Sequence, residues 1–283
     1  MNELDKYTPR PEQSAELLKE LHILTRDGKL NQDSRRKLKQ IYHLYQFILP
    51  LLEDIVRENN HTPILVDHGA GKSYLGFILY DLFYKSLNIT EPKVYGIELR
   101  KELVLKSMTL AQKLKFSGMY FLHLSVEESI TSDKLPDQID IVTALHACDT
   151  ATDDAITFAL KRQAKYIVLV PCCQAEIAKE LKSIKASSLT NQYLYELWHH
   201  PIQAREFGAH LTNVLRILQL ETHGYTVTVT ELVGFEHSMK NELIIAKFTG
   251  KANLISQLRL TEILENFALG NLKSKFLTAI ATS

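Results

Sequence analysis

The sequence predicts an α/β fold with a mainly parallel β-sheet that is covered by helices on both faces. Between residues 64 and 170, short apolar segments alternate with helical segments of about ten to fifteen residues, the pattern of βαβ units. The pattern changes near the C-terminus, where two β-type segments are separated by only nine residues. Because nine residues are too few for a crossover helix, we expect this last pair to be antiparallel.

Each predicted strand is an apolar or β-branched run bounded by charged or turn residues. Five such runs are expected to form the parallel part of the sheet: Ile64–Asp67, Lys93–Glu98, Met119–Leu124, Ile139–Leu145 and Tyr166–Val170. The helical segments between them include Tyr74–Leu87, Lys101–Lys115 and Asp153–Lys161. The final pair consists of Tyr225–Val233, in which polar and apolar residues alternate, and Leu243–Phe248.

Further helices are expected outside the sheet. Apolar residues recur at helical spacing over Leu17–Leu24, and Asp27-Gly28 is expected to end that helix. A second helix is expected to begin within Asn31–Asp33, with a kink at Pro50. The segment from Asn253 onward is expected to be a packed helix. We therefore expect an N-terminal helical extension over 1–60, a central domain over 61–250 and a C-terminal helical tail over 251–283.

The composition restricts the class of protein. Basic and acidic residues both number 33, so the net charge is zero and no overall field attracts polyanions, although a local basic face could still do so. No apolar run has transmembrane length, and charges occur throughout the first twenty residues, which argues against a secretory signal. Cys148, Cys172 and Cys173 lack the spacings of a disulfide framework or a zinc site, so we expect a cytoplasmic protein without a metal.

Residues 67–73 (DHGAGKS) join the first predicted strand to a helix. Glycines in such a turn let the backbone approach a ligand closely. A phosphate-binding loop would need a glycine where Val66 stands, and a dinucleotide turn would need one where Tyr74 stands. Asp-x-Gly-x-Gly is instead typical of turns that bind S-adenosylmethionine (SAM); an ordinary tight turn is the alternative. The residues expected to contact the cofactor here are Asp67, Gly69, Gly71, Lys72, Ser73 and Tyr74.

The ends of the following strands support a nucleoside-type ligand. Glu98 ends the second strand, where a carboxylate can accept hydrogen bonds from both ribose hydroxyls. Its alternative role is a solvated residue at the cap of the next helix. Ser125 and Val126 follow the third strand, where a contact to adenine is expected, and Leu145 ends the fourth.

Five segments carry a family likeness: DSRRKLKQI (33–41), VDHGAGKSYL (66–75), ALHACDTATDDA (144–155), VPCCQ (170–174) and HSMKNEL (237–243). Together they resemble class I SAM-dependent methyltransferases related to the CCHH-type tRNA 2′-O-methyltransferases and to uncharacterised methyltransferase-like proteins. The resemblance implies a class I methyltransferase (Rossmann-like) sheet, SAM as methyl donor and RNA as acceptor. Gln174-Ala175 stand where the tRNA enzymes have a histidine pair, a departure that concerns the tRNA substrate rather than the cofactor.

The reacting groups are expected outside the carboxyl ends of the fourth and fifth strands. His146 and Asp149 follow the fourth strand, and either could act as a base toward a hydroxyl acceptor. The alternative for His146 is a buried structural histidine. The alternative for Asp149 is a cap of the helix that begins near Asp153, a role that Thr150 or Thr152 could share.

Three further candidates, Cys172, Cys173 and Gln174, follow the fifth strand. A cysteine thiolate could act as a nucleophile, but adjacent cysteines after a buried strand favour packing or the shaping of a substrate pocket. Lys240-Asn241, between the last two strands, could face the same cleft or form a plain hairpin turn.

Two stretches could contact RNA. A basic stretch that includes Arg35, Arg36, Lys37 and Lys39 could dock phosphates, or it could be a solvated helix face. The stretch 193–200 (YLYELWHH) offers aromatic rings that could stack on unpaired bases. The spacing of Leu194, Leu197 and Trp198 favours a core position instead.

The sequence therefore predicts a SAM-dependent methyltransferase that acts on a macromolecule, with RNA as the first choice. A protein acceptor is the alternative among methyltransferases. A non-catalytic SAM-binding partner module and an NAD-dependent oxidoreductase are the alternatives from other classes. The sequence leaves the oligomeric state open.

Overall fold

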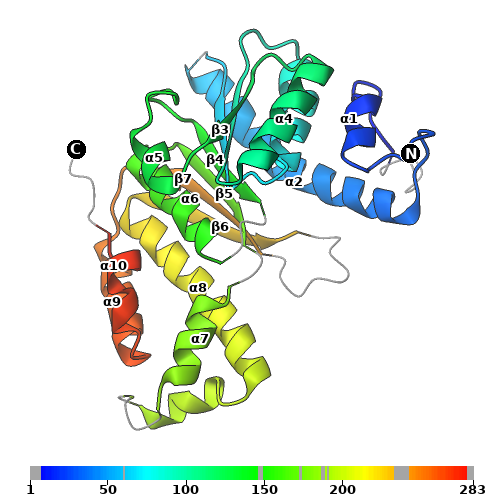
Figure 1. Cartoon of the computed structure of the whole chain (residues 1–283). Coiled ribbons are helices and arrows are strands. Elements are labelled where there is room, and N and C mark those ends of the chain that lie inside the picture. The colour runs from blue at the N-terminus through cyan, green and yellow to red at the C-terminus, as the bar shows by residue number, and fades with distance from the viewer. Residues whose placement is uncertain are drawn as a thin grey trace.

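The computed structural model describes residues 8–59, 61–145, 149–171, 174–185, 189, 191–232 and 242–278. A seven-stranded sheet with the order β3-β2-β1-β4-β5-β7-β6 lies at its centre, with helices on both faces (Figure 1). Strands β1 to β5 are parallel, and β7 runs antiparallel to both β5 and β6. The α/β class and the antiparallel C-terminal pair are thus confirmed.

The strands lie close to the predicted segments: β1 (Ile64–His68), β2 (Lys93–Glu98), β3 (Met119–His123), β4 (Ile141–Leu145), β5 (Tyr166–Val170), β6 (Tyr225–Glu231) and β7 (Glu242–Phe248). Strand β5 is buried along its whole length, as expected for a strand covered on both faces. Leu65 is in register with Val94 on one side and with Ile141 on the other. The carboxyl ends of β1, β2 and β4 therefore meet at one edge, where open α/β sheets bind ligands.

The helices form two layers over the sheet. One layer contains α2 (Gln32–Asn59), α3 (Tyr74–Leu79) and α4 (Lys101–Leu114), whose apolar residues share one core with β1 and β2. The other layer contains α5 (Val126–Thr131), α6 (Thr150–Lys161) and α8 (Pro201–Thr222), and α6 and α8 contribute to a second core. Pro50 lies inside α2, which continues on both sides of it.

A third core lies off the sheet. It joins α7 (Glu176–Ser183) and α8 to the C-terminal helix α9 (Leu254–Asn266) and to α10 (Lys273–Phe276), which the 3-10 helix η5 (Gly270–Leu272) precedes. Trp198, which follows the 3-10 helix η4 (Gln192–Leu197), is buried in this core, as its spacing predicts. Leu197 is half exposed, so its predicted core position is wrong. In Figure 1, α7 and the start of α8 project below the sheet.

Two predicted helices differ in the structure. The first, α1 (Ala15–Glu20), ends well before Asp27-Gly28. His22 adopts a left-handed conformation with φ 55°, and the N–H groups of Ile23 and Leu24 both donate to the carbonyl of Leu18. This closure satisfies free carbonyls at the helix end and places the remaining apolar residues in a turn.

The predicted helix over Tyr74–Leu87 is α-helical only as far as Leu79. It continues as a π-helical segment, η2 (Tyr80–Lys85). Inside this segment the buried Asp81 accepts hydrogen bonds from Ser14 N and Lys85 Nζ, which ties α1 to the helix. Among the helices of the described ranges, none is long and apolar enough to cross a membrane.

Candidate active site

The turn after β1 needs left-handed backbone at three places. Gly69, Gly71 and Ser73 have φ values of 66°, 57° and 51°. Glycine adopts such values without strain, which accounts for the two glycines of the Asp-x-Gly-x-Gly pattern. Ser73, the N-cap of α3, makes no side-chain cap bond to the helix. Its hydroxyl instead donates to Asp67 Oδ2 at 3.4 Å.

The Asp67 side chain connects this turn to the sheet. Its side chain is buried, and Thr143 on β4 donates to Oδ1 at 2.9 Å. Burial raises the pKa of the Asp67 carboxyl to about 7, although the hydrogen bonds from Thr143 and Ser73 work in the opposite direction. Asp67 therefore joins the β1 turn to the neighbouring strand, and it does so without a cationic partner among the described residues.

Close contact between the turn, α3 and β2 depends on two other glycines. A Cβ atom on Gly76 would lie 2.6 Å from Ser73 Oγ, and one on Gly96 would lie 2.7 Å from Phe121 Cδ1. Tyr74 occupies the position of a third turn glycine, yet α3 still packs on β2 because Gly76 faces the sheet. A bulky residue at position 74 therefore does not hold the helix away from the sheet.

Glu98 connects the end of β2 to the β1 turn. The Gly71 N–H donates to Glu98 Oε2 at 2.8 Å, and Arg100 donates to Oε1 from its backbone N and from Nε, both at 2.9 Å. Burial by itself raises the pKa of this carboxyl, but these hydrogen bonds outweigh it and hold the pKa below its usual value. Glu98 is buried and Arg100 is the N-cap of α4, so the alternative of a solvated cap residue is wrong.

Ser125, which follows β3, is the N-cap of α5. The Ser125 hydroxyl accepts the Glu128 N–H at 3.2 Å, and the Ser125 N–H donates to Glu128 Oε2 at 2.7 Å. This capping box engages the Ser125 N–H and one lone pair of its hydroxyl. The next backbone donor is the N–H of Val126, in the first turn of α5, where helix amides lack intrahelical partners. Leu145, half-buried, ends β4, and Lys72 is exposed in the β1 turn.

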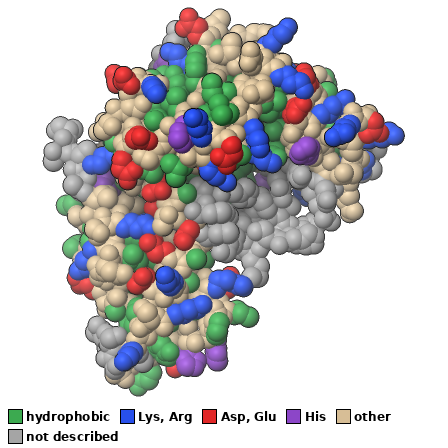
Figure 2. Space-filling view, in the orientation of Figure 1, with side chains coloured by type: hydrophobic (Ala, Val, Ile, Leu, Met, Phe, Trp, Pro, Cys, Tyr) green, Lys and Arg blue, Asp and Glu red, His purple; other side chains and the backbone are tan. Residues whose placement is uncertain are grey.

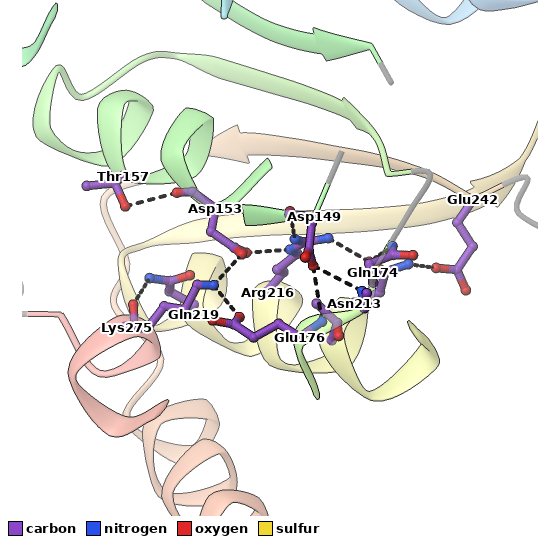
Figure 3. Close-up of polar contacts among 12 residues, drawn as sticks. Asp149, Asp153, Thr157, Gln174, Glu176, Asn213, Arg216, Gln219, Glu242 and Lys275 are labelled. Atoms are coloured by element: carbon purple, nitrogen blue, oxygen red, sulfur yellow. Dashed lines mark hydrogen bonds and ion pairs between the residues drawn. The ribbon is translucent and has the colours of Figure 1, made fainter. Parts of the chain in front are cut away.

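Asp149 caps a different helix from the expected one. It precedes α6 with φ 51° and makes no side-chain cap bond to that helix. Its Oδ1 instead accepts the N–H groups of Ala175 and Glu176 at 3.0 and 3.2 Å, at the start of α7 (Figure 3). Asp149 thus connects two loops. It lies in the loop after β4, and it caps α7, the helix that follows the loop after β5.

A buried guanidinium on α8 supports both loops. Arg216 is only 1% exposed; its Nε donates to Asp153 Oδ1 at 2.6 Å and its Nη2 to the Asp149 carbonyl at 2.9 Å. Lys275 Nζ lies 2.8 Å from Asp153 Oδ2 and also pairs with Glu176 (Figure 3). Every charge in this cluster has a partner, as buried charges require.

Gln174 lies at the edge of the same cluster and is 4% exposed. Its Nε2 donates to Asn213 Oδ1 at 2.9 Å, and Asn213 in turn donates to Glu242 at the start of β7. Gln174 Oε1 is buried and accepts no hydrogen bond from the part of the chain that the structure describes. The loop after β5 thus presents one buried acceptor without a donor.

Several predicted residues cannot be placed. His146, Cys172, Cys173 and the pair Lys240-Asn241 lie outside the described residues, as do the side chains of Arg36 and Lys37. Of the other basic residues near the start of α2, Arg35 is exposed and Lys39 is half-buried. Within the described ranges, no three side chains of the metal-binding types gather into a site.

Sequence reasoning missed some residues that shape the site: Thr143, Arg100, Asn213 and Arg216. Arg100 follows Glu98 by two residues, a spacing that could have suggested the contact. Arg216 and Asn213 lie three residues apart in a helix with many buried residues, and a charged residue on a buried face is a signal of pairing. For Thr143, an interior residue of a buried strand, we see no such signal.

Curated relatives and solved structures that are similar to this chain were found. The glutathione S-transferase C-terminal domain-containing protein homolog of Drosophila melanogaster is 25% identical over 236 residues, which cover 75% of this chain and 37% of the relative. The protein of that name from Bos taurus is 24% identical over 244 residues, covering 79% and 35%. The chain thus spans about a third of the length of these relatives.

Among solved structures, the magnesium protoporphyrin IX methyltransferase of Synechocystis PCC 6803 with bound SAH is 15% identical, with a TM-score of 0.43. The match covers 84% of this chain and 95% of that one. A family model described as a methyltransferase domain matches residues 36–180, which include β1 to β5 and the β1 turn. The chain belongs to this methyltransferase-domain family.

Proposed function

We propose that this protein is a SAM-dependent methyltransferase whose acceptor is RNA. The observation that carries the proposal is the 2.8 Å hydrogen bond from Gly71 N to Glu98 Oε2. It brings the glycine turn of β1 and the terminal acid of β2 together at the edge of the sheet where ligands bind. Membership of the methyltransferase-domain family supports the same reaction class.

The described residues fit SAM. Backbone groups of the left-handed turn at Gly69 and Gly71 would contact its amino-acid part, and Glu98 would accept the ribose hydroxyls. The Val126 N–H would face adenine. Glu98 must exchange some present donors for the ribose, and the Arg100 side chain, which is 62% exposed, is free to move away. The family membership disfavours an oxidoreductase.

The chemistry that SAM supplies is an electrophilic methyl group, and the protein must place the acceptor in line with it. Asp149 and Gln174 lie at the ends of the two loops beside the expected methyl position, within one hydrogen-bonded cluster. In this proposal Asp149 holds the loops together and Gln174 contacts the acceptor. A base role for His146 stays part of the proposal.

RNA is the preferred methyl acceptor in this proposal for two reasons. The HACDTATD and VPCCQ segments resemble the CCHH-type tRNA 2′-O-methyltransferases, and the start of α2 is basic. We also propose that residues 61–250 form the catalytic domain and that the flanking helical segments cover it. Protein methylation remains the alternative that the experiment below separates.

The cofactor site is tested by SAM binding, measured by isothermal titration calorimetry. Glu98→Gln should weaken binding at least tenfold, because charged hydrogen bonds to the ribose contribute roughly 1.5–3 kcal/mol. Glu102→Gln is the matched control, since Glu102 is exposed in the first turn of α4. Equal SAM affinity in the two variants would refute the proposed site.

The acceptor is tested with labelled SAM and a lysate divided into RNA and protein fractions. We expect label in RNA that ribonuclease removes and that Glu98→Gln reduces at SAM concentrations below saturation. Label in protein alone would replace RNA by a protein acceptor. SAM binding without label in either fraction would favour a non-catalytic module.

A further inference from the structure

A groove of about 520 Å³ opens between α7 and the start of α8, beside the buried amide of Gln174. Three of its lining side chains are cations: Lys179, Lys182 and Arg205. The described lining also includes Ala178 and Ile202 and no acidic residue, although Arg205 Nε pairs with its neighbour Glu206 at 2.7 Å. At its inner end the helices touch closely, since a Cβ on Gly208 would lie 2.7 Å from the backbone of Ala178.

The charges of α7 are divided between its two sides. Glu176 pairs with Lys275, and Glu180 accepts a hydrogen bond from Asn271, so both acids are engaged by the C-terminal helices. Lys179 and Lys182 line the groove, are exposed, and form no ion pair with any residue of the described ranges. A concave surface with unneutralised cations attracts an anionic ligand.

Gln174 gives the groove a specific hydrogen-bonding group. Its Oε1 is buried and has no donor among the described residues, whereas its Nε2 is fixed by Asn213. A buried acceptor without a partner carries a desolvation cost that a ligand N–H would remove. The amide belongs to the loop after β5, which Asp149 joins to the loop after β4, so a group bound to it would lie beside the proposed methyl site.

The groove lining has an exposed apolar side chain, and the 3-10 helix that precedes α8 has an exposed ring. Ile202, in the groove lining, is 68% exposed, and Tyr193 on η4, the 3-10 helix that leads into α8, is 86% exposed. Exposed rings are stacking platforms for unpaired bases. Figure 2 shows lysine and arginine side chains gathered over the projecting part of the molecule that contains α7 and the start of α8.

We infer that this groove binds the single-stranded RNA segment that carries the acceptor nucleotide, an inference that rests on the proposed function. Its phosphates contact Lys179, Lys182 and Arg205, and a base N–H of the acceptor nucleotide donates to Gln174 Oε1. Phosphates explain the cations that α7 presents on one side only, and a base explains the buried acceptor. A duplex keeps its Watson–Crick edges paired, and the deep, narrow major groove of A-form RNA keeps its remaining amino N–H groups away from a buried amide.

The test is binding of a fluorescein-labelled single-stranded RNA 12-mer, measured by anisotropy at several salt concentrations. Lys179→Gln combined with Lys182→Gln should weaken binding roughly tenfold and reduce the slope of log K against log salt by roughly 1.4, because each lost phosphate contact removes about 0.7. Lys251→Gln combined with Arg259→Gln removes the same charge from exposed positions outside the groove and should leave both values nearly unchanged. Melting temperature and SAM affinity verify that both double variants are folded.

The outcomes separate the groove from the proposed function. Equal RNA affinity and salt slope in the two double variants, with methyl transfer to RNA intact, would refute the groove and leave the methyltransferase proposal standing. Equal competition by an RNA duplex would refute the single-strand assignment. Wild-type protein that binds SAM but neither binds nor labels RNA would refute both proposals.

Discussion

Arg100 holds both carboxylate oxygens of Glu98, with Nε 2.9 Å from Oε1 and Nη2 3.4 Å from Oε2. The remaining donors to these oxygens are backbone N–H groups of Gly71 and Arg100 itself. The carboxylate that would bind a ribose therefore already accepts four hydrogen bonds. Because the guanidinium is the only side chain among these donors, it is the group that can leave.

Arg100→Gln should bind SAM as tightly as the wild type, or a few-fold more tightly, since the ribose no longer competes with the guanidinium. The Arg100 side of the ion pair is 62% exposed, so the pair should contribute only about 0–1 kcal/mol to stability and the protein should stay folded. Calorimetry with SAM is the measurement, and Lys101→Gln is the control from the same turn. A tenfold loss of affinity would instead make Arg100 part of the cofactor site.

Asp67→Asn should change the dependence of stability on pH. Burial raises the pKa of Asp67 to about 7 in the folded protein, whereas an aspartate in an unfolded chain has a pKa of about 3.9. Between these values the folded protein keeps a proton that the unfolded chain has released. The free energy of unfolding therefore falls as pH rises from about 4 to about 7 and is level above that.

Asparagine does not titrate, so its free energy of unfolding lacks this decrease. The free energy of unfolding of Asp67→Asn relative to the wild type should therefore rise between about pH 4 and about pH 7. The total change is on the order of 4 kcal/mol, from about 1.4 kcal/mol for each pKa unit. Urea denaturation at pH 4.5 and pH 8 measures it, with the exposed Asp133→Asn as control. A stability difference that is constant with pH would show that the pKa of Asp67 is not raised.

Asp149→Asn and Asp149→Ala should separate a structural role from a catalytic one. Asparagine keeps an oxygen that accepts the N–H groups of Ala175 and Glu176, so we expect Asp149→Asn to retain methyl transfer within a few-fold. Alanine removes the cap of α7, which should cost about 1 kcal/mol. The measurements are transfer rate and melting temperature. Loss of transfer in a stable Asp149→Asn protein would assign Asp149 a base role.

Gly208→Ala should destabilise the packing of α7 on α8. The added Cβ would meet Cα and N of Ala178 at 2.7 Å, and backbone atoms cannot rotate away. Overpacking of this kind costs about 1–3 kcal/mol, which exceeds the helix propensity gained over glycine. Gly270→Ala is the control, because its Cβ would have no neighbour within 4 Å. Denaturation midpoints compare them, and an unchanged midpoint for Gly208→Ala would show that the helices can separate freely.

The sequence by itself determined the elements and their order. Alternating apolar strands and amphipathic helices, and a nine-residue gap between the last two strands, are local patterns, and they gave the α/β class and the antiparallel pair. The glycines of the β1 turn could also be recognised from the sequence. The left-handed backbone at Gly69 and Gly71 is a local requirement, which glycine meets without strain. Helix ends were predicted less well, since α1 ends just before a left-handed His22 that the sequence pattern does not mark as a stop.

Only the tertiary structure decided which polar groups meet. For Asp149 the alternative to a catalytic role was a cap of its own helix, and its carboxylate caps α7 instead. Thr143, Gly76 and Arg216 belong to the site through contacts between segments that are distant in the sequence. Thr143 bonds to Asp67, Gly76 lies against β2 and β3, and Arg216 bonds to Asp153. Periodicity reports which face of an element is buried, and the partner of a buried polar group depends on how the elements pack together.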